Sequence, residues 1–109
     1  MIWQIRYTQD AEKDFLQLDG SQKILVQKAL RKVSKNPLPD YQGGYGKPLA
    51  NKVNTKLAGC LKIKLKAAGI RIVYKLVEID GAMVIIVIGA RADNEVYEIA
   101  HKRLSNISR

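Results

Sequence analysis

The sequence predicts a basic β-hairpin that gathers three cationic side chains on one face: Lys62, Lys64 and Arg71. Residues 61–66 alternate strictly between apolar residues and lysines, which is the period-2 pattern of a strand with one buried face. A turn over residues 66–69 leads into a second strand over residues 70–77, which is rich in β-branched side chains. If the turn takes four residues, Leu65 pairs with Ile70, and parity then places all three cations on the same face.

Such a cationic face favours a polyanionic partner. Like charges directly across a strand pair destabilise it by a few tenths to about 1 kcal/mol, and a bound polyanion would compensate for that repulsion. The whole chain has a formal net charge of +9, as is typical of nucleic-acid-binding domains. Between Tyr41 and Val77 there is no Asp or Glu. The same segment contains five further lysines that we expect to contact nucleic acid: Lys47, Lys52, Lys56, Lys66 and Lys75.

The residues before the hairpin are predicted to form a strand and two helices. Residues 2–7 alternate as a strand does, and Thr8 is a good N-cap for a short helix to about Leu18. Ser21 is predicted to cap a longer helix that continues to about Asn36. The apolar residues that we expect to face inward on this second helix are Ile24, Leu25, Ala29, Leu30 and Val33.

Residues 36–55 are rich in Gly and Pro and predict a long loop. Loops that exceed about 12 to 15 residues are usually functional or mobile. Tyr41 and Tyr45 lie in this loop, and we expect them to anchor it on the core. Stacking on unpaired nucleic-acid bases is the alternative for both tyrosines.

One more strand and one more helix follow the hairpin. Asp80 and Gly81 predict a second tight turn. The strand after it, residues 83–89, is apolar on both faces and is therefore expected at the centre of the sheet. Asp93 or Asn94 is predicted to cap the last helix.

The register of that central strand decides where Arg91 lies. A two-residue turn would pair Arg71 with Ala90 and place Arg91 on the other face of the sheet. A three-residue connection, or a bulge near Gly89, would bring Arg91 beside Arg71. The residues alone do not choose between these two registers.

The predicted order of elements is β-α-α-β-β-β-α, in a single domain over residues 1–109. This order is typical of the α+β class, with an antiparallel sheet, a helical hairpin on one face and a C-terminal helix.

Composition excludes several classes of site. Cys60 is the sole cysteine, so an internal disulfide and a four-thiolate zinc site are impossible, and we expect neither a metal nor another cofactor. His101 is the sole histidine, and its position inside the last helix favours a structural role. The longest apolar run, residues 82–90, is too short to cross a bilayer, and residues 1–15 lack a signal-peptide pattern. We therefore expect a cytoplasmic protein.

Residues 60–76, CLKIKLKAAGIRIVYKL, and residues 87–104, VIGARADNEVYEIAHKRL, resemble the RelE family of the RelE/ParE toxin superfamily. The specific part is KIKL, a turn with Gly, R-x-V-Y, then G-x-R and E-V-Y before a terminal helix. The resemblance implies a RelE-like fold and the toxin of a type II toxin-antitoxin system, a ribosome-dependent endonuclease that cuts messenger RNA in the ribosomal A site. By motif position it implies five catalytic residues: Lys62, Lys64, Arg71, Arg91 and Tyr97.

The implied reaction suits these residue types. RNA supplies its own nucleophile, the 2′-hydroxyl, so cleavage requires in-line geometry, a proton acceptor, a proton donor for the leaving 5′-oxygen, and cations around the phosphorus. A metal ion is not required. Arg71 and Arg91 suit the phosphate because a guanidinium binds it bidentately and stays charged. Tyr97 is suited to orient a base or a phosphate.

Two other functions remain open at this point. A ParE-like toxin shares the fold but poisons DNA gyrase and cuts no RNA. The lysine pair and E-V-Y favour the endonuclease over this alternative. A non-catalytic RNA-binding or co-repressor module would use the basic face only to neutralise phosphates. For the endonuclease the expected partners are the ribosome, its messenger RNA and a cognate antitoxin, whose acidic or amphipathic segment would cover the helices and the basic face. No membrane partner is expected.

Overall fold

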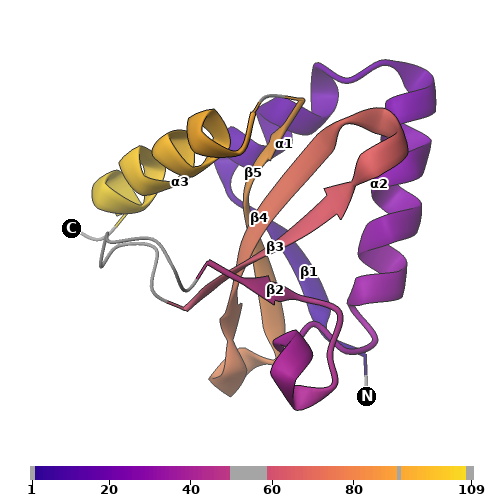
Figure 1. The fold of residues 1–109 in the computed structure, drawn as a ribbon. Coiled ribbons are helices and arrows are strands. Elements are labelled where there is room, and N and C mark those ends of the chain that lie inside the picture. The colour runs from indigo at the N-terminus through magenta and orange to yellow at the C-terminus, as the bar shows by residue number, and fades with distance from the viewer. Residues whose placement is uncertain (1, 50–58, 91, 108–109) are drawn as a thin grey trace.

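The computed structural model describes residues 2–49, 59–90 and 92–107. The protein folds as a five-stranded sheet with helices on both faces (Figure 1). The strands lie in the order β1-β5-β4-β3-β2. The helices and strands are β1 (Gln4–Tyr7), α1 (Gln9–Leu16), α2 (Gly20–Val33), β2 (Lys47–Pro48), β3 (Cys60–Leu65), β4 (Ile70–Val77), β5 (Ala82–Gly89) and α3 (Asp93–Ile107). None of the helices in the described ranges has the length and apolarity that a membrane crossing requires.

The predicted α+β class and element order are confirmed, with one difference from the predicted antiparallel sheet and one added strand. The sheet is antiparallel from β2 to β5, but β1 runs parallel to β5 at the edge. The short strand β2, which was not predicted, lies within the expected loop and pairs with β3. It adds a fifth strand beside the basic hairpin.

The N-terminal helices begin at side-chain caps. Thr8 caps α1 as predicted, because its Oγ1 accepts a hydrogen bond of 3.1 Å from the Ala11 amide. The cap of α2 is Asp19 rather than Ser21, so that prediction was wrong. Asp19 accepts from the Gln22 amide at 2.8 Å, and the Gln22 side chain accepts from the Asp19 amide at 3.0 Å, which completes a capping box.

The buried side of α2 agrees with the prediction at Leu30 and Val33 and differs from it at Ile24 and Leu25. Val26, Leu30 and Val33 are buried, at spacings of four and three that suit a helix lying on a sheet. Ile24 and Leu25 were expected to face inward but are 64% and 44% exposed. They lie about 200° and 100° around the helix from Val26, so the packing that buries Val26 turns both away.

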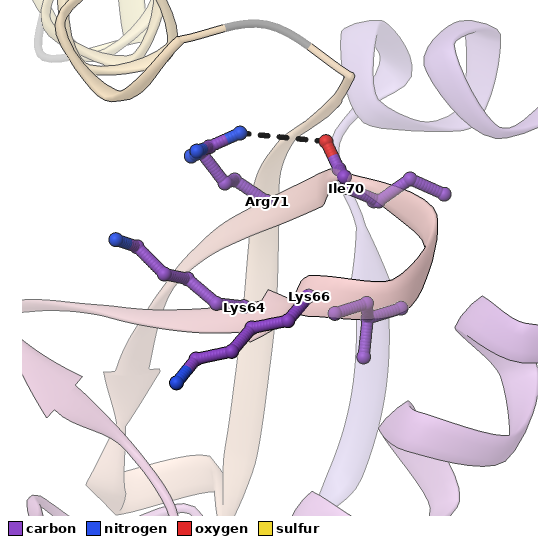
Figure 2. A pocket seen from close by; sticks show the side chains of 6 residues that line it. Lys64, Lys66, Ile70 and Arg71 are labelled. Atoms are coloured by element: carbon purple, nitrogen blue, oxygen red, sulfur yellow. Dashed lines mark hydrogen bonds between the residues drawn. The ribbon is translucent and has the colours of Figure 1, made fainter.

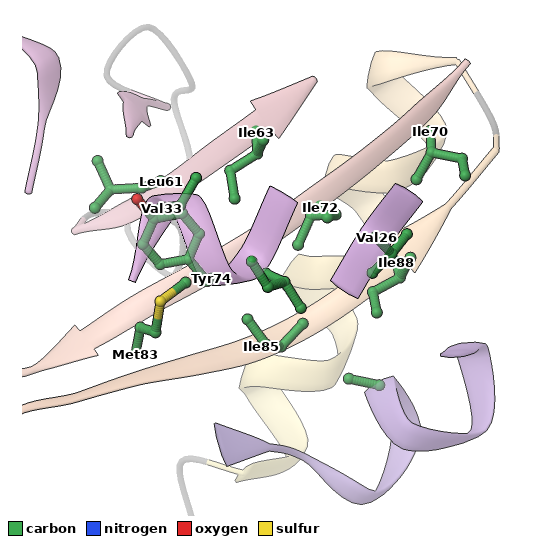
Figure 3. Close-up of a cluster of buried hydrophobic side chains, with 12 residues drawn as sticks. Val26, Val33, Leu61, Ile63, Ile70, Ile72, Tyr74, Met83, Ile85 and Ile88 are labelled. Carbon is green, nitrogen blue, oxygen red and sulfur yellow. The ribbon is translucent and has the colours of Figure 1, made fainter. Parts of the chain in front are cut away.

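Two apolar clusters cover the two faces of the sheet. The larger one lies between the sheet and helices α1 and α2, and Figure 3 shows Val26 and Val33 packed over Ile72, Tyr74 and Ile85. The smaller one lies under α3 and contains Leu49, Cys60, Val73, Ile86, Val87, Val96, Tyr97, Ala100 and Leu104. The helical hairpin and the C-terminal helix therefore lie on opposite faces (Figure 1).

A β-bulge in β5 sets the register across from Arg71. Tyr74 pairs with Ile85, but Val73 pairs with Val87, so Ile86 has no partner in β4. The bulge puts both Ile86 and Val87 on the α3 face.

The connection between β4 and β5 also differs from the predicted tight turn. Val77 pairs with Ala82, so the connection takes four residues, and Gly81 closes it at a φ of 61°. Arg71 consequently lies opposite Gly89, so the register of a two-residue turn, which would pair Arg71 with Ala90, is not the one adopted. The other register considered from the sequence allowed a bulge near Gly89. The strand does have a bulge, but it lies at Ile86. Arg91 is outside the described residues.

The loop after α2 is anchored by a tyrosine that lies outside it. The Tyr74 hydroxyl, from β4, donates a hydrogen bond of 2.7 Å to the Pro37 carbonyl. Tyr41 and Tyr45 are 75% and 48% exposed, so the prediction that they anchor the loop was wrong. Tyr74 already fills the space beneath this loop, and Tyr45 instead lies under Lys32, whose Nζ is 5.2 Å from its ring centroid.

Candidate functional site

The β3–β4 hairpin has the predicted register. Leu65 pairs with Ile70, Lys64 with Arg71, and Leu61 with Tyr74. A short 3-10 turn over residues 66–68 connects the strands, and Gly69 closes it at a φ of 66°, in the left-handed region that glycine adopts without strain. Lys62, Lys64 and Arg71 thus lie on one face of the sheet, the face that also carries α3.

Lys64 and Arg71 line an open pocket of about 190 Å³ at the tip of this hairpin. Figure 2 shows both side chains extending from adjacent strands. The guanidinium of Arg71 donates a hydrogen bond of 3.4 Å to the Gly69 carbonyl, which ties it to the turn. Lys66 also lines the pocket. Three of the six residues that line the pocket are therefore cationic, which attracts phosphate.

Lys62 and Tyr97 are in direct contact. The Lys62 ammonium donates a hydrogen bond of 2.8 Å to the Tyr97 hydroxyl and lies 5.4 Å from the centroid of its ring. Tyr97 is 4% exposed and packs in the cluster under α3. The tyrosine therefore has a packing role, and its hydroxyl also brings α3 to the basic hairpin. An amine and a phenol in contact can exchange a proton, which is the chemistry of a general acid or base.

Three of the other predicted lysines extend this surface. Lys47 in β2 pairs directly with Lys62, so the two share a face. Lys75 pairs with Cys60, which is buried under the α3 face. Burial raises the pKa of the Cys60 thiol, and the nearby charge of Lys75 partly opposes that shift. Lys66 lies in the turn, whereas Lys52 and Lys56 are outside the described residues.

The first turn of α3 passes close to Gly89 in β5, the residue that pairs with Arg71. A Cβ added to Gly89 would lie 3.7 Å from Cγ2 of Val96, which is ordinary van der Waals contact. The helix therefore starts over the end of β5, beside the strand that carries Arg71. Of the five predicted catalytic residues, four gather on this face: Lys62, Lys64, Arg71 and Tyr97.

An ion pair that the sequence did not single out holds the other side of α3. Arg103 donates to both carboxylate oxygens of Asp14 in α1, at 2.6 and 3.0 Å. The two residues are 89 positions apart, so no local pattern could have found them. Among the described residues no group of three or more His, Cys, Asp or Glu side chains could hold a metal ion.

Comparison with known proteins shows to which family the chain belongs. No protein-family model matches it. A RelE-like toxin protein of Escherichia coli is 30% identical over 108 residues, which cover 95% of this chain and 99% of that protein. The chain belongs to the RelE toxin family. The mRNA interferase toxin RelE of Escherichia coli K12 is 28% identical over 104 residues, again covering 95% of this chain and 99% of the relative.

Solved structures agree with this placement. A variant of the Escherichia coli toxin RelE in its free state superposes with a TM-score of 0.71 at 27% identity, covering 94% of this chain and 98% of that one. A RelE variant in complex with a peptide of its antitoxin superposes with a TM-score of 0.66 at 26% identity, covering 92% and 95%.

Proposed function

We propose that this RelE-family toxin, acting as one domain over residues 1–109, is an endoribonuclease that cuts messenger RNA in the ribosomal A site. The observation that carries the proposal is the contact between Lys62 and Tyr97 beside the pair of Lys64 and Arg71. That arrangement places an amine, hydrogen-bonded to a phenol, beside two further cations on an open face. The names of its relatives support the same activity, since two of them are called mRNA interferases.

The proposed reaction needs only the RNA and these side chains. The 2′-oxygen loses its proton and attacks the adjacent phosphorus in line, and the bond from phosphorus to the 5′-oxygen breaks. The 5′-oxygen takes up a proton, leaving a 2′,3′-cyclic phosphate and a 5′-hydroxyl. We assign the proton transfers to Lys62 and Tyr97. We assign stabilisation of the charge on the phosphate to Lys64 and Arg71, together with Arg91 from the motif.

The rest of the cationic face is proposed to hold RNA and the ribosome. Five lysines contribute: Lys47, Lys52, Lys56, Lys66 and Lys75. Their role would be electrostatic, so binding should weaken as salt rises. A protein with this function works in the cytoplasm, where the ribosomes are.

We also propose that a cognate antitoxin holds the protein inactive. The antitoxin peptide bound to the related RelE supports such a partner. Ile24 and Leu25 are two exposed apolar side chains on α2, which suit contact with the apolar side of an amphipathic segment. An acidic segment would in turn be attracted to the basic hairpin.

Programmed ribosomes provide the test. The protein is incubated with ribosomes that carry a defined codon in the A site, and the 5′ ends of the messenger are mapped. We expect a cut within that codon, lost in Lys62→Ala and Arg71→Ala. Lys28→Ala is the matched control, because Lys28 is exposed on α2 and α2 packs on the opposite face of the sheet.

Two outcomes would reject this function. Intact messenger together with gyrase-dependent DNA damage would show a gyrase poison instead. Salt-sensitive RNA binding without any cut would show a binding module.

A further inference from the structure

On the β1 side, no strand in the described part of the chain pairs with the C-terminal half of β5, and side chains cover this edge. β1 pairs with Ala82 to Ile85 only, so it stops short of the last four residues of β5. At this edge Asp14 accepts a hydrogen bond of 3.0 Å from the Ile88 amide. Arg103 donates one of 2.9 Å to the Ile86 carbonyl. The Ile88 amide and the Ile86 carbonyl, on either side of Val87, therefore have side-chain partners, one from α1 and one from α3.

Asp14 and Arg103 also form a two-pronged ion pair with each other. The distances are 2.6 Å from Nη1 to Oδ2 and 3.0 Å from Nη2 to Oδ1. Their side chains are 17% and 20% exposed, so the pair is largely screened from water. The hydrogen bond to Asp14 raises the pKa of Arg103, and the carboxylate of Asp10 lies 3.9 Å away on its outer side. Such bidentate, charge-assisted contacts fix orientation as well as distance.

The pair lies on a different side of α3 from the Tyr97 hydroxyl. Arg103 follows Tyr97 by six residues, which separates the two side chains by about 120° around the helix axis. One side of α3 is thus tied to β3 through Lys62, and another side to the edge of β5. Between these ties the helix rests on apolar residues, and apolar contact by itself is non-directional. These two polar contacts therefore restrict how far α3 can roll across the sheet.

The same pair holds the bulge that sets the register of Arg71. Arg103 binds the carbonyl of Ile86, the residue without a partner in β4. Asp14 binds the amide of Ile88, in the stretch of β5 that runs on to Gly89 opposite Arg71. One ion pair consequently contacts both the helix that carries Tyr97 and the strand segment that faces Arg71.

We propose that Asp14 and Arg103 are positioning residues of the RNA-cleaving site, which hold α3 so that the Tyr97 hydroxyl meets Lys62. The proposal rests on the function proposed above. Neither residue touches the reacting atoms; both act through the orientation of α3 and the shape of β5. Loss of the pair lets α3 roll on its apolar contacts, which separates Tyr97 from Lys62 while the fold persists.

The test compares Arg103→Gln with Lys102→Gln. Both changes remove one positive charge from α3, but Lys102 is exposed and the matched variant leaves the ion pair intact. In Arg103→Gln we expect kcat for messenger cleavage on ribosomes to fall about 10- to 100-fold, as for a small misplacement of a reacting group, with KM nearly unchanged. Lys102→Gln should keep the wild-type kcat.

A spectroscopic measurement follows the contact itself, without RNA. The ring resonances of Tyr97 are observed in protein with carbon-13-labelled tyrosine and are assigned with Tyr97→Phe. In Arg103→Gln we expect the Tyr97 signal to move toward that of free tyrosine, and in Lys102→Gln to stay in place. An unmoved Tyr97 signal in folded Arg103→Gln would overturn the positioning role.

A double variant separates positioning from stability. Arg103→Gln alone leaves the largely buried charge of Asp14 unpaired and destabilises the protein, whereas Asp14→Asn with Arg103→Gln removes both charges. We expect the double variant to regain thermal stability but not kcat. A kcat that recovers together with stability would overturn the proposal. If the wild type cuts no messenger, the proposed function fails, and the Tyr97 resonance still decides whether the pair orients α3.

Discussion

The Lys62 ammonium donates a hydrogen bond of 2.8 Å to the hydroxyl of Tyr97, a residue 35 positions later in the chain. The contact joins strand β3 to helix α3 at the point where the cationic face meets the cluster under the helix. It makes Tyr97 both a packing residue and a functional candidate, and these two roles can be separated by experiment.

Tyr97→Phe should remove the chemistry and keep the packing. The ring stays in its buried place, and the cost in stability is that of one hydrogen bond, about 1 kcal/mol. We expect messenger cleavage on ribosomes to fall about 100-fold, the size of a lost general acid or base, while affinity for the ribosome is kept. Tyr45→Phe is the matched control, since Tyr45 is half exposed and packs under Lys32. Full activity in Tyr97→Phe would assign the residue to packing alone.

Tyr74→Phe should loosen the loop after α2. The variant loses the buried hydrogen bond to the Pro37 carbonyl, and we expect a loss of about 1 to 2 kcal/mol in urea unfolding at neutral pH. Burial raises the pKa of Tyr74, so the folded state holds the neutral phenol, while the unfolded chain ionises near pH 10. The stability that Tyr74 contributes is therefore present below pH 10 and declines above it. A difference between wild type and variant that stays constant up to pH 11 would contradict this linkage.

Asp19→Asn should change how the stability of the protein depends on pH. The Gln22 amide, and then the Ser21 hydroxyl, lower the pKa of Asp19. A lowered folded-state pKa gives stability that is present above the unfolded value, near pH 4, and lost as pH falls through the folded value. We expect wild type to exceed Asp19→Asn in urea midpoint at pH 7 and to converge with it near pH 2. Ser21→Ala should have the smaller effect at pH 7, because Ser21 is not the cap; an equal or larger loss would point back to Ser21.

Gly44→Ala should destabilise far more than Gly20→Ala. A Cβ on Gly44 would overlap the backbone carbonyl of Leu38, which cannot move without opening the turn. We expect a loss of about 1 to 3 kcal/mol, as in other overpacked sites. Gly20 has nothing within 4 Å of such a Cβ and opens α2, so alanine there should be neutral or stabilising. Thermal unfolding of both variants checks the contrast, and equal melting temperatures would contradict it.

The basic hairpin could be predicted because its information is local. Strict alternation fixed the face of Lys62 and Lys64, and a four-residue turn then fixed every pair up to Leu61 with Tyr74. Strand β5 gave no such signal. It is apolar on both faces, so its pattern was the same with or without a bulge at Ile86. The register opposite Arg71 consequently depends on tertiary contacts.

The error about the buried side of α2 has a similar origin. Ile24, Leu25 and Val26 are consecutive apolar residues, and helical spacing alone allowed more than one inward stripe. The choice of Val26 comes from the sheet on which the helix packs. The cap was misplaced for a different reason: only Ser21 was predicted, whereas Asp19 and Gln22, three residues apart, form a capping box that is a local signal in the sequence.

The half of the β5 edge that no described strand covers affects the behaviour of the protein in concentrated solution. An unpaired strand edge is a template on which another chain can add a strand, and it is a common route to aggregation. Here Asp14 and Arg103 occupy the amide of Ile88 and the carbonyl of Ile86, so a docking strand would first have to displace a charged pair. The residues that orient α3 thus also protect the sheet from edge-to-edge association between copies.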